Sequence, residues 1–390
     1  MTAPAARPGR RRLLYLTYAG NPVDGATSGI ETGQVRELLK ELASDFEIEW
    51  LALVHESVPD PGALGAYRES LAAKAVGFEL VVLPAGRVRR YVSAWRLVRR
   101  KLRAFGPEVV HARRLVAAAL ALLNRQRRQR VIFDARGIAS AEALGAPGRH
   151  IHRRVLAAAG MWMLEVVAAG FSAATVTVSL EMRRHFARLT RRPVVTIPNS
   201  AASYFRFDPA LRAAVRRELG YGNGQAVLAY AGGLASWWQS PEGIARSFRA
   251  FRSTVPDARL LVLTPHSPTL VHRHQSDDER QATAFRHVPH EQVPGCFCAS
   301  DVGLLVLNTA SKANCQASAV KFAEYLACGL PVFTLSAVTQ AAGVIRQSGA
   351  GAIGEQPEDI AGCAQRLLSP DTRAAALKTG DGLGIARAAA

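Results

Sequence analysis

The sequence contains little cysteine, and its cysteines are not spaced for a structural role. All 5 cysteines in the 390 residues lie in the C-terminal half. The Cys-x-Cys pair of Cys296 and Cys298 has no second pair at zinc-finger spacing. We therefore expect reduced thiols, which are typical of a cytosolic protein.

The sequence also lacks a pattern of metal ligands. His266, His272 and His274 are irregularly spaced, and no glutamate accompanies them at the spacing of a metalloprotease. Asp277 and Asp278 lie in a polar stretch that we interpret as a solvated loop. The sequence therefore predicts no metal site.

No segment is typical of a secretory signal. Basic residues 7–12 run directly into the apolar residues 13–16, a run that is too short for a signal peptide. A second apolar run, residues 155–178, is long enough to cross a membrane. Because Glu165 lies in its middle and its end is strand-like, we predict a buried helix followed by a strand at residues 174–178.

Acidic residues are too few to balance the basic ones. The sequence contains 31 Asp and Glu residues but 49 Lys and Arg residues, which gives a formal net charge of +18. Such a charge attracts nucleic acid, anionic lipid or phosphorylated molecules, unless it only reflects an Ala- and Arg-rich composition. No nucleic-acid recognition module is visible, so nucleic acid is not an expected partner. The arginine-rich helix expected at residues 87–103 either lies on an anionic membrane surface or packs on its own sheet.

What the chain does contain is a regular alternation of strand and helix patterns. Short apolar runs alternate with amphipathic segments in the first half, and the same order repeats in the second half. This order is typical of parallel sheets with crossover helices. We therefore predict an α/β fold of two Rossmann-like, doubly wound domains that face each other across a cleft, residues 1–200 and 201–390.

The expected elements follow from the same patterns. The expected strands are residues 13–17, 46–54, 78–83, 109–111, 131–134, 174–178, 194–197, 226–231, 260–263, 302–307 and 332–333. The main expected helices are residues 32–42, 88–105, 115–124, 241–251, 290–299, 339–347 and 357–368. Because ligands of such sheets bind beyond the carboxyl ends of strands, four loops are candidate sites: residues 18–30, 134–137, 232–239 and 308–316.

The segment at residues 318–332 carries a charge in an unusual place. Ser318 is the expected N-cap of a helix that ends at Gly329. Lys321 lies in the first turn, where the helix dipole favours negative charge. An anion such as phosphate that bound both Lys321 and the free backbone N–H groups would explain this cation. Glu324 would then accept hydrogen bonds from hydroxyl groups; the alternative is an ordinary amphipathic helix.

Six segments together resemble the GT-B glycosyltransferases, in particular the large retaining family (family 4-like, group 1) that uses nucleotide sugars. Their order and spacing carry the resemblance, and the last segment matches best. In chain order they are Ser-Gly-Ile-Glu (28–31), Val-Val-His-Ala-Arg (109–113), Val-Ile-Phe-Asp-Ala-Arg-Gly (131–137), Ile-Pro-Asn-Ser (197–200), Tyr-Ala-Gly-Gly (230–233) and Lys-Phe-x-Glu-Tyr-Leu-Ala-x-Gly-Leu-Pro-Val (321–332).

This resemblance implies a retaining, metal-independent hexosyltransferase of polysaccharide or glycoconjugate biosynthesis that needs no cofactor. Its partners would be a nucleotide-sugar donor, a glycan or lipid-linked acceptor and an anionic membrane surface, at the inner face of which a cytoplasmic protein would act. The resemblance places Gly29, Gly232, Gly233, Lys321 and Glu324 at the donor. It assigns Lys321 to the diphosphate and Glu324 to the ribose.

The same resemblance places His111, Arg113 and Arg136 at the acceptor and gives Asp134, Gln316 and Lys321 as catalytic candidates. Asp134 stands where relatives carry a histidine; it either holds a hydroxyl group or only caps the turn.

The chain departs from the family pattern where charge matters. Family members carry two glutamates separated by seven residues, but here Gln316 stands at the first position. An amide hydrogen-bonds sugar hydroxyls but cannot stabilise an oxocarbenium-like charge. The Arg and Lys that hold the diphosphate in many relatives are replaced near Gly233 and Gln239. Lys321 and Arg136 are the candidates to supply that charge.

The C-terminus departs as well, since the helix that crosses back to the first domain in relatives is expected to be short or absent. Two alternatives on the same fold follow from these departures. One is a nucleotide-sugar-binding protein with impaired catalysis, and the other is a sugar-nucleotide epimerase.

Overall fold

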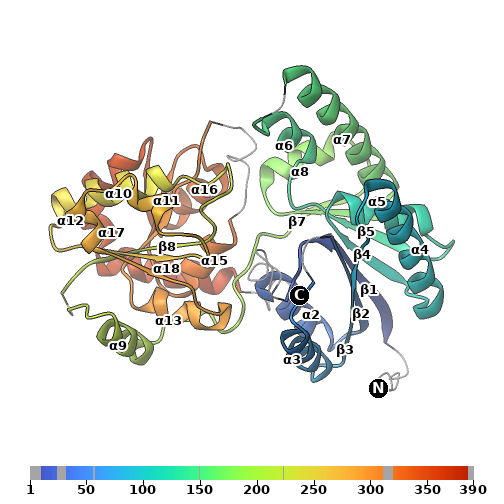
Figure 1. Cartoon of the computed structure of the whole chain (residues 1–390), viewed down its shortest axis with the longest axis horizontal. Coiled ribbons are helices and arrows are strands. Elements are labelled where there is room, and N and C mark those ends of the chain that lie inside the picture. The colour runs from blue at the N-terminus through green and yellow to red at the C-terminus, as the bar shows by residue number, and fades with distance from the viewer. Residues whose placement is uncertain are drawn as a thin grey trace. The chain divides into compact units, whose positions relative to one another are not determined.

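The computed structural model describes residues 10–23, 32–55, 58–148, 150–222, 224–310 and 319–384. The chain divides between Pro198 and Asn199 into two compact units, each built on its own sheet (Figure 1). The four cysteines among the described residues, Cys296, Cys298, Cys328 and Cys363, are free thiols.

The first unit contains a seven-stranded parallel sheet with strand order β3-β2-β1-β4-β5-β6-β7. The chain leaves β1 toward β2 and β3 and then returns to place β4 on the other side of β1. The strands are β1 (Arg11–Ala19), β2 (Phe46–Val54), β3 (Val76–Val82), β4 (Val109–Arg113), β5 (Arg130–Asp134), β6 (Ala174–Thr177) and β7 (Val194–Thr196).

Helices of the first unit cover the sheet, so that β1 is buried from Leu13 to Ala19. A buried polar pair beside β1 is hydrogen-bonded: Trp50 Nε1 donates to Thr17 Oγ1 at 3.1 Å. The helices are η1 (Thr32–Arg36), α2 (Glu37–Leu42), α3 (Pro61–Ala72), α4 (Arg87–Phe105), α5 (Leu115–Asn124), α6 (Ala139–Gly145), α7 (Ile151–Phe171) and α8 (Leu180–Ala187).

The second unit repeats this plan with a six-stranded parallel sheet of order β10-β9-β8-β11-β12-β13. The strands are β8 (Val227–Ala231), β9 (Arg259–Leu263), β10 (Thr283–Arg286), β11 (Val302–Leu305), β12 (Val332–Leu335) and β13 (Gly351–Gly354). The helices are α9 (Pro209–Glu218), α10 (Pro241–Thr254), α11 (Thr269–His272), α12 (Asp277–Gln281), η2 (His290–Gln292), α13 (Val293–Cys298), α15 (Val320–Ala327), α16 (Thr339–Ser348), η3 (Pro357–Asp359), α17 (Ile360–Leu367) and α18 (Pro370–Gly382).

The predicted fold class is confirmed, because both units are doubly wound parallel sheets. In each sheet the strand order reverses beside the first strand, between β1 and β4 and between β8 and β11. Ligands of such sheets bind in the crevice at the carboxyl ends of these strands. The last described helix, α18, packs against α15 within the second unit.

Two local predictions were wrong. Residues 277–281 form the short helix α12 and not a loop, because Ser276 and Glu279 make a reciprocal capping box. Helix α7 was predicted to be buried, yet eight of its large apolar side chains are exposed. Among the described residues it is the one helix that is long and apolar enough to cross a membrane. An apolar sequence does not reveal which face of a helix is covered.

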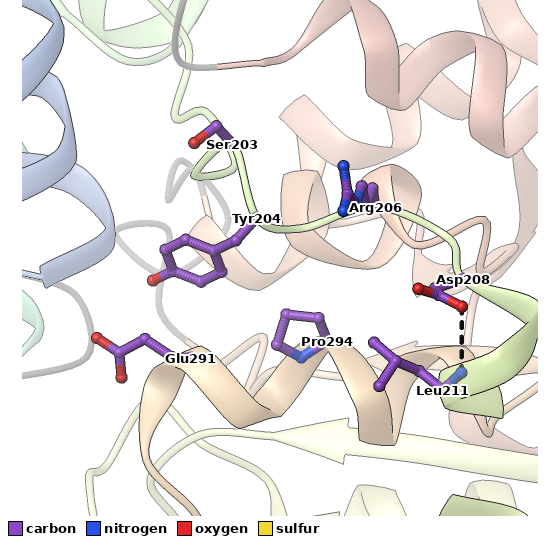
Figure 2. Close-up of a pocket in the computed structure, with 7 residues that line it drawn as sticks. All are labelled: Ser203, Tyr204, Arg206, Asp208, Leu211, Glu291 and Pro294. Carbon is purple, nitrogen blue, oxygen red and sulfur yellow. Dashed lines mark hydrogen bonds between the residues drawn. The ribbon is translucent and has the colours of Figure 1, made fainter. Parts of the chain in front are cut away.

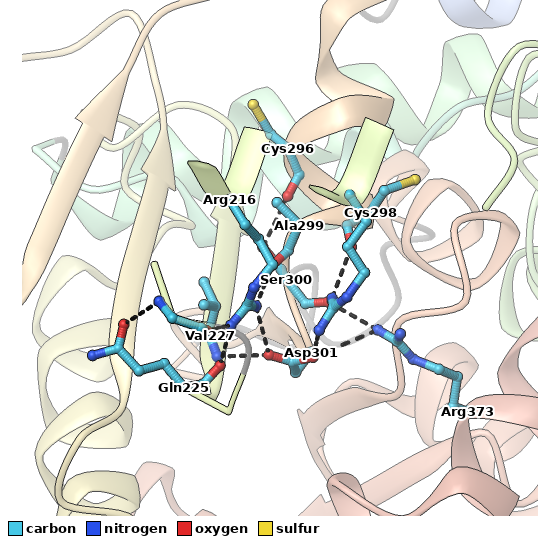
Figure 3. A network of polar contacts seen from close by, with 11 residues as sticks. Arg216, Gln225, Val227, Cys296, Cys298, Ala299, Ser300, Asp301 and Arg373 are labelled. Carbon is cyan, nitrogen blue, oxygen red and sulfur yellow. Dashed lines mark hydrogen bonds and ion pairs between the residues drawn. The ribbon is translucent and has the colours of Figure 1, made fainter. Parts of the chain in front are cut away.

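Asp301, at the start of β11, anchors a network of arginines in the second unit (Figure 3). Its carboxylate accepts hydrogen bonds from Arg212 Nη2 at 2.8 Å and from the backbone N–H of Val227 at 2.9 Å. Arg216 is only 3% exposed and lies 3.4 Å from the same carboxylate. Arg216 also donates to the carbonyl groups of Ala299 and Gln225, so helix α9 is tied to the segments that lead into the central strands β11 and β8.

We predict that Asp301→Ala lowers the free energy of unfolding of the second unit by about 3 kcal/mol, because it leaves the buried Arg216 guanidinium without its counter-ion. Urea unfolding followed by tryptophan fluorescence measures this, since Trp237 and Trp238 lie in the second unit. The control is Asp277→Ala, which removes the exposed ion pair with Arg280 and should change stability by less than about 0.5 kcal/mol. Equal effects of the two substitutions would contradict the anchoring role of Asp301.

Candidate active site

The carboxyl ends of β4 and β5 bring one carboxylate and three basic side chains together in the first unit. Asp134 is 1% exposed, and its Oδ2 accepts a hydrogen bond from Arg136 Nε at 3.0 Å. Arg113 Nη1 lies 3.5 Å and His111 Nε2 lies 3.3 Å from the same oxygen. The parallel register of β4 and β5, which pairs Arg113 with Asp134, explains this meeting.

The basic side chains keep Asp134 ionised. Burial alone would raise the pKa of Asp134, but Arg136, His111 and Arg113 hold it well below its usual range. Burial and the neighbouring Arg113 in turn lower the pKa of Arg136. Two guanidinium groups thus face one carboxylate, so the cluster retains positive charge when His111 is neutral. Asp134 Oδ1 has no hydrogen-bond partner among the described residues.

In the second unit, Lys321 lies over the end of β8. Its Nζ is 3.9 Å from the centroid of the Tyr230 ring, a cation–π contact. A Cβ atom on Gly232 would approach this Nζ to 3.4 Å, and the φ angle of Gly232 is +132°. Both observations favour glycine at this turn, because a side chain would be strained and would crowd the amine.

The Lys321 amine is shut off from solvent and has no polar partner in the part of the chain that the structure describes. Although the residue as a whole is partly exposed, Nζ is buried and makes no hydrogen bond to any described residue. Burial lowers the pKa of Lys321 to about 7, while the Glu324 carboxylate acts in the opposite direction. A bound anion could form charge-assisted hydrogen bonds with such an amine.

The helix that carries Lys321 is fixed at its C-terminal end. Gly329 adopts a φ of +71°, and the N–H groups of Gly329 and Leu330 donate to the carbonyls of Leu326 and Tyr325, which is a Schellman motif. The predicted stop at Gly329 is therefore confirmed. At the other end Ala319 occupies the N-cap and makes no side-chain hydrogen bond. The first-turn N–H groups of α15 thus lack a side-chain cap among the described residues.

Glu324 is part of a hydrogen-bonded chain that the sequence did not predict. Its Oε1 lies 3.0 Å from His290 Nε2, and His290 Nδ1 lies 2.7 Å from the hydroxyl of Tyr204. Glu324 is only 5% exposed, so these contacts fix the direction of its carboxylate. His290 begins the helix predicted at residues 290–299, but no spacing pattern connects it with Glu324.

The loop after β8 makes further polar contacts. A Cβ atom on Gly233 would meet His266 Cε1 at 3.3 Å, so Gly233 permits a close approach of the loop that follows β9. The Tyr230 hydroxyl lies 2.7 Å from Gln239 Oε1. Asn308, after β11, donates to the carbonyl of Trp237 at 3.0 Å. The loop predicted at residues 232–239 thus meets Asn308, the first residue of the loop predicted at residues 308–316, at the carboxyl end of the sheet.

A cavity of about 370 Å³ lies in the second unit beside α13 (Figure 2). Its lining residues are Ser203, Tyr204, Arg206, Asp208, Leu211, Glu291 and Pro294. Sequence reasoning selected none of them, because they come from a connecting segment and from helices α9, η2 and α13, and no motif marks them. Tyr204 joins this cavity to Glu324 through His290.

The predicted site residues therefore form two groups. His111, Arg113, Asp134 and Arg136 meet in the first unit. Gly232, Gly233, Lys321 and Glu324 lie along the carboxyl end of the second sheet. Gly29 and Gln316 lie outside the described residues.

The described part of the chain contains no group of three or more His, Cys, Asp or Glu residues that would hold a metal ion.

Comparisons with solved structures show the same two-sheet fold. The chain resembles sucrose-phosphate synthase from Thermosynechococcus elongatus with a TM-score of 0.71 at 13% identity, covering 97% of this chain and 96% of the other. It resembles HepE from Anabaena in complex with UDP and glucose with a TM-score of 0.68 at 13% identity, covering 97% of both chains. It also resembles WaaG, a glycosyltransferase involved in lipopolysaccharide biosynthesis, with a TM-score of 0.65 at 16% identity, covering 95% of both chains.

Comparisons of sequence identify the family. No curated protein matches the chain. Residues 28–201 match the family model for Glycosyltransferase Family 4, and residues 246–387 match the model described as Glycosyl transferase-like. One match lies in each unit, on either side of the division at Pro198 and Asn199. The chain therefore belongs to the GT-B glycosyltransferases of the family 4-like type.

Proposed function

We propose that the protein is an active, retaining, metal-independent hexosyltransferase that moves a sugar from a nucleotide-sugar donor to a glycan or lipid-linked acceptor. It acts in the cytoplasm, at the inner face of the membrane, in the synthesis of a polysaccharide or glycoconjugate. The observation that carries the proposal is the buried Lys321 amine, which lies over the Tyr230 ring beside Gly232 and has no hydrogen-bond partner among the described residues.

A nucleoside diphosphate is the ligand that completes this arrangement. The β-phosphate would lie between Lys321, the backbone of Gly232 and the first-turn N–H groups of α15. Glu324, oriented by His290, would accept hydrogen bonds from the ribose hydroxyls. The solved complex of HepE with UDP and glucose supports a donor of this class. The role of WaaG in lipopolysaccharide biosynthesis supports a glycoconjugate acceptor.

The first unit would hold the acceptor at the cluster around Asp134. Arg113 and Arg136 would attract a phosphorylated or otherwise anionic acceptor, and the ionised Asp134 would accept a hydrogen bond from its hydroxyl group. His111 lies at the same carboxylate and would help to orient it. Gly29, which lies outside the described residues, stays a candidate contact for the donor phosphates.

The chemical step needs charge stabilisation more than a protein nucleophile. As the bond between the sugar and the β-phosphate breaks, negative charge grows on the phosphate oxygens, where Lys321 would stabilise it. The leaving phosphate would assist the incoming hydroxyl, so that the new bond forms on the face from which the nucleotide leaves. Gln316 would hold sugar hydroxyls by hydrogen bonds without adding negative charge.

A screen of nucleotide sugars tests the proposed activity. We expect slow hydrolysis of at least one donor by the full chain, measured as release of the nucleoside diphosphate. We also expect Gln316→Glu to change the rate, because it restores a carboxylate beside the sugar. Nucleotide binding without turnover of any donor, unimproved by Gln316→Glu, would contradict the enzyme and leave a binding protein. Conversion of one donor into its epimer without an acceptor would instead identify an epimerase.

We predict that Lys321→Met weakens binding of the preferred nucleoside diphosphate by about 100-fold, because it removes a charge-assisted contact with phosphate. The same substitution should stabilise the nucleotide-free protein, because it removes a buried amine without a polar partner. Isothermal titration calorimetry measures the first effect and urea unfolding the second. The control is Lys378→Met on the exposed face of α18, which should alter neither. Loss of both affinity and stability in Lys321→Met would show a merely structural role.

Binding of the diphosphate should also take up a proton at pH 8. Lys321 with a pKa of about 7 is mostly neutral at that pH, and a bound phosphate raises its pKa and favours the ammonium. Calorimetry in buffers of different ionisation enthalpy should therefore give an uptake that approaches one proton at pH 8 and falls toward zero near pH 6. Lys321→Met should abolish the uptake. Release of protons by the wild type would contradict the assignment.

A further inference from the structure

Helix α7 presents a long apolar face that no described part of the first unit covers. Figure 1 shows it beside α6 and α8 on the outside of the first unit. Between residues 155 and 171 the single charged residue is Glu165, which is 1% exposed and points inward. The exposed apolar side chains are Ile151 (64%), Val155 (52%), Leu156 (75%), Trp162 (48%), Met163 (64%), Leu164 (41%), Val167 (44%) and Phe171 (64%).

The rotation of α7 is fixed by its polar inner side. Glu165 accepts hydrogen bonds from the backbone N–H and the hydroxyl of Ser140 at 3.0 and 2.8 Å, and His185 Nε2 lies 3.0 Å from its Oε2. These contacts tie α7 to α6 and α8. Rotating α7 to bury this apolar face would turn Glu165 outward and break its hydrogen bonds with Ser140 and His185. The outward apolar face is therefore a stable property of the fold.

Both ends of this face are basic. At the C-terminal end, Arg125 Nη1 donates to the carbonyl of Phe171 at 3.2 Å, and the exposed Arg127 and Arg128 follow in the same turn. At the N-terminal end, His152 and Arg153 are exposed. Apolar side chains between basic ends are typical of a helix that lies in the interface of an anionic bilayer.

The pattern fits a bilayer better than a second copy of the chain. Two α7 helices that paired along their apolar faces would bring a basic end against a basic end in either a parallel or an antiparallel arrangement. A transmembrane position does not fit either, because it would place Glu165 in the hydrocarbon and break its contacts with Ser140 and His185.

We propose that α7 docks the first unit onto an anionic phospholipid bilayer, with Leu156, Met163 and Val167 seated among the acyl chains and the arginines at the headgroup phosphates. The inference rests on the proposed function in one respect, because docking would bring the protein to a lipid-linked acceptor. The apolar surface of α7 does not involve the residues of the proposed donor site. It places the membrane contact on α7 and not on the arginine-rich α4.

Co-sedimentation of the full chain with vesicles tests the docking. Wild-type protein should pellet with vesicles of 30% phosphatidylglycerol and 70% phosphatidylcholine in 0.1 M NaCl, and binding should fall on going to 0.5 M NaCl because the arginine contacts are screened. Leu156→Glu combined with Met163→Glu should weaken binding by at least about 10-fold, since it places two charges in the acyl region. Arg127→Gln combined with Arg128→Gln should weaken it by about 10-fold or more.

The matched control is Val88→Glu on α4, an apolar residue that is 77% exposed and is also flanked by arginines. It should bind vesicles like the wild type. Circular dichroism and calorimetry with the nucleoside diphosphate should show that Leu156→Glu/Met163→Glu folds and keeps its donor site. Absence of donor turnover would therefore contradict the proposed function but not the docking, which vesicle binding tests separately.

Three outcomes would overturn the docking. The first is equal vesicle binding by wild type and by Leu156→Glu/Met163→Glu, or loss of binding in Val88→Glu instead. The second is sedimentation velocity that shows a dimer which Leu156→Glu/Met163→Glu dissociates, without vesicle binding by the wild type. The third is resistance of bound wild type to extraction by alkaline carbonate, which would indicate a spanning helix.

Discussion

The proposed function depends on the enclosure of the Lys321 amine in the second unit. A cation–π contact with Tyr230 stabilises the ammonium form of Lys321 less than hydration in water would. The buried amine therefore loses its proton more readily than an exposed lysine. Because Gly232 has no side chain, the space beside the Lys321 amine is not filled by this turn. The Schellman motif and the packing of α18 hold the helix in place. In the proposed function, the buried amine lowers the stability of the nucleotide-free protein, and the site is formed before the nucleotide binds.

The fold was largely predictable because buried parallel strands leave a strong sequence signal. The apolar run of β2 and the apolar helical face of α4 predicted the type of each element and its bounds to within a few residues. Strands β10 and β13 were not predicted: the first is polar at both ends, and the second, Gly-Ala-Ile-Gly, has too few side chains for a pattern. They form because neighbouring strands offer them hydrogen bonds, and this tertiary context is invisible in the sequence.

The candidate site was predictable where it follows from strand ends. Asp134 and Arg113 meet because β4 and β5 are parallel and in register, which the alternation of strands and helices implies. The link from Glu324 through His290 to Tyr204 spans three separate segments. No spacing rule joins such residues. The exposed face of α7 was missed for a related reason, since hydrophobicity alone does not show what a helix packs against.

The packing of α18 on α15 has a mechanical consequence. A Cβ atom on Gly380 would lie 2.5 Å from the carbonyl oxygen of Leu326, so the two helices touch backbone to backbone. Leu377 fills the space beside Gly329 in the same contact. This backbone contact, with Leu377 packed beside it, leaves α15 little room to slide or tilt. In the proposed function, α15 would stay in place, and any widening of the donor site to admit a sugar would come from the segments around it.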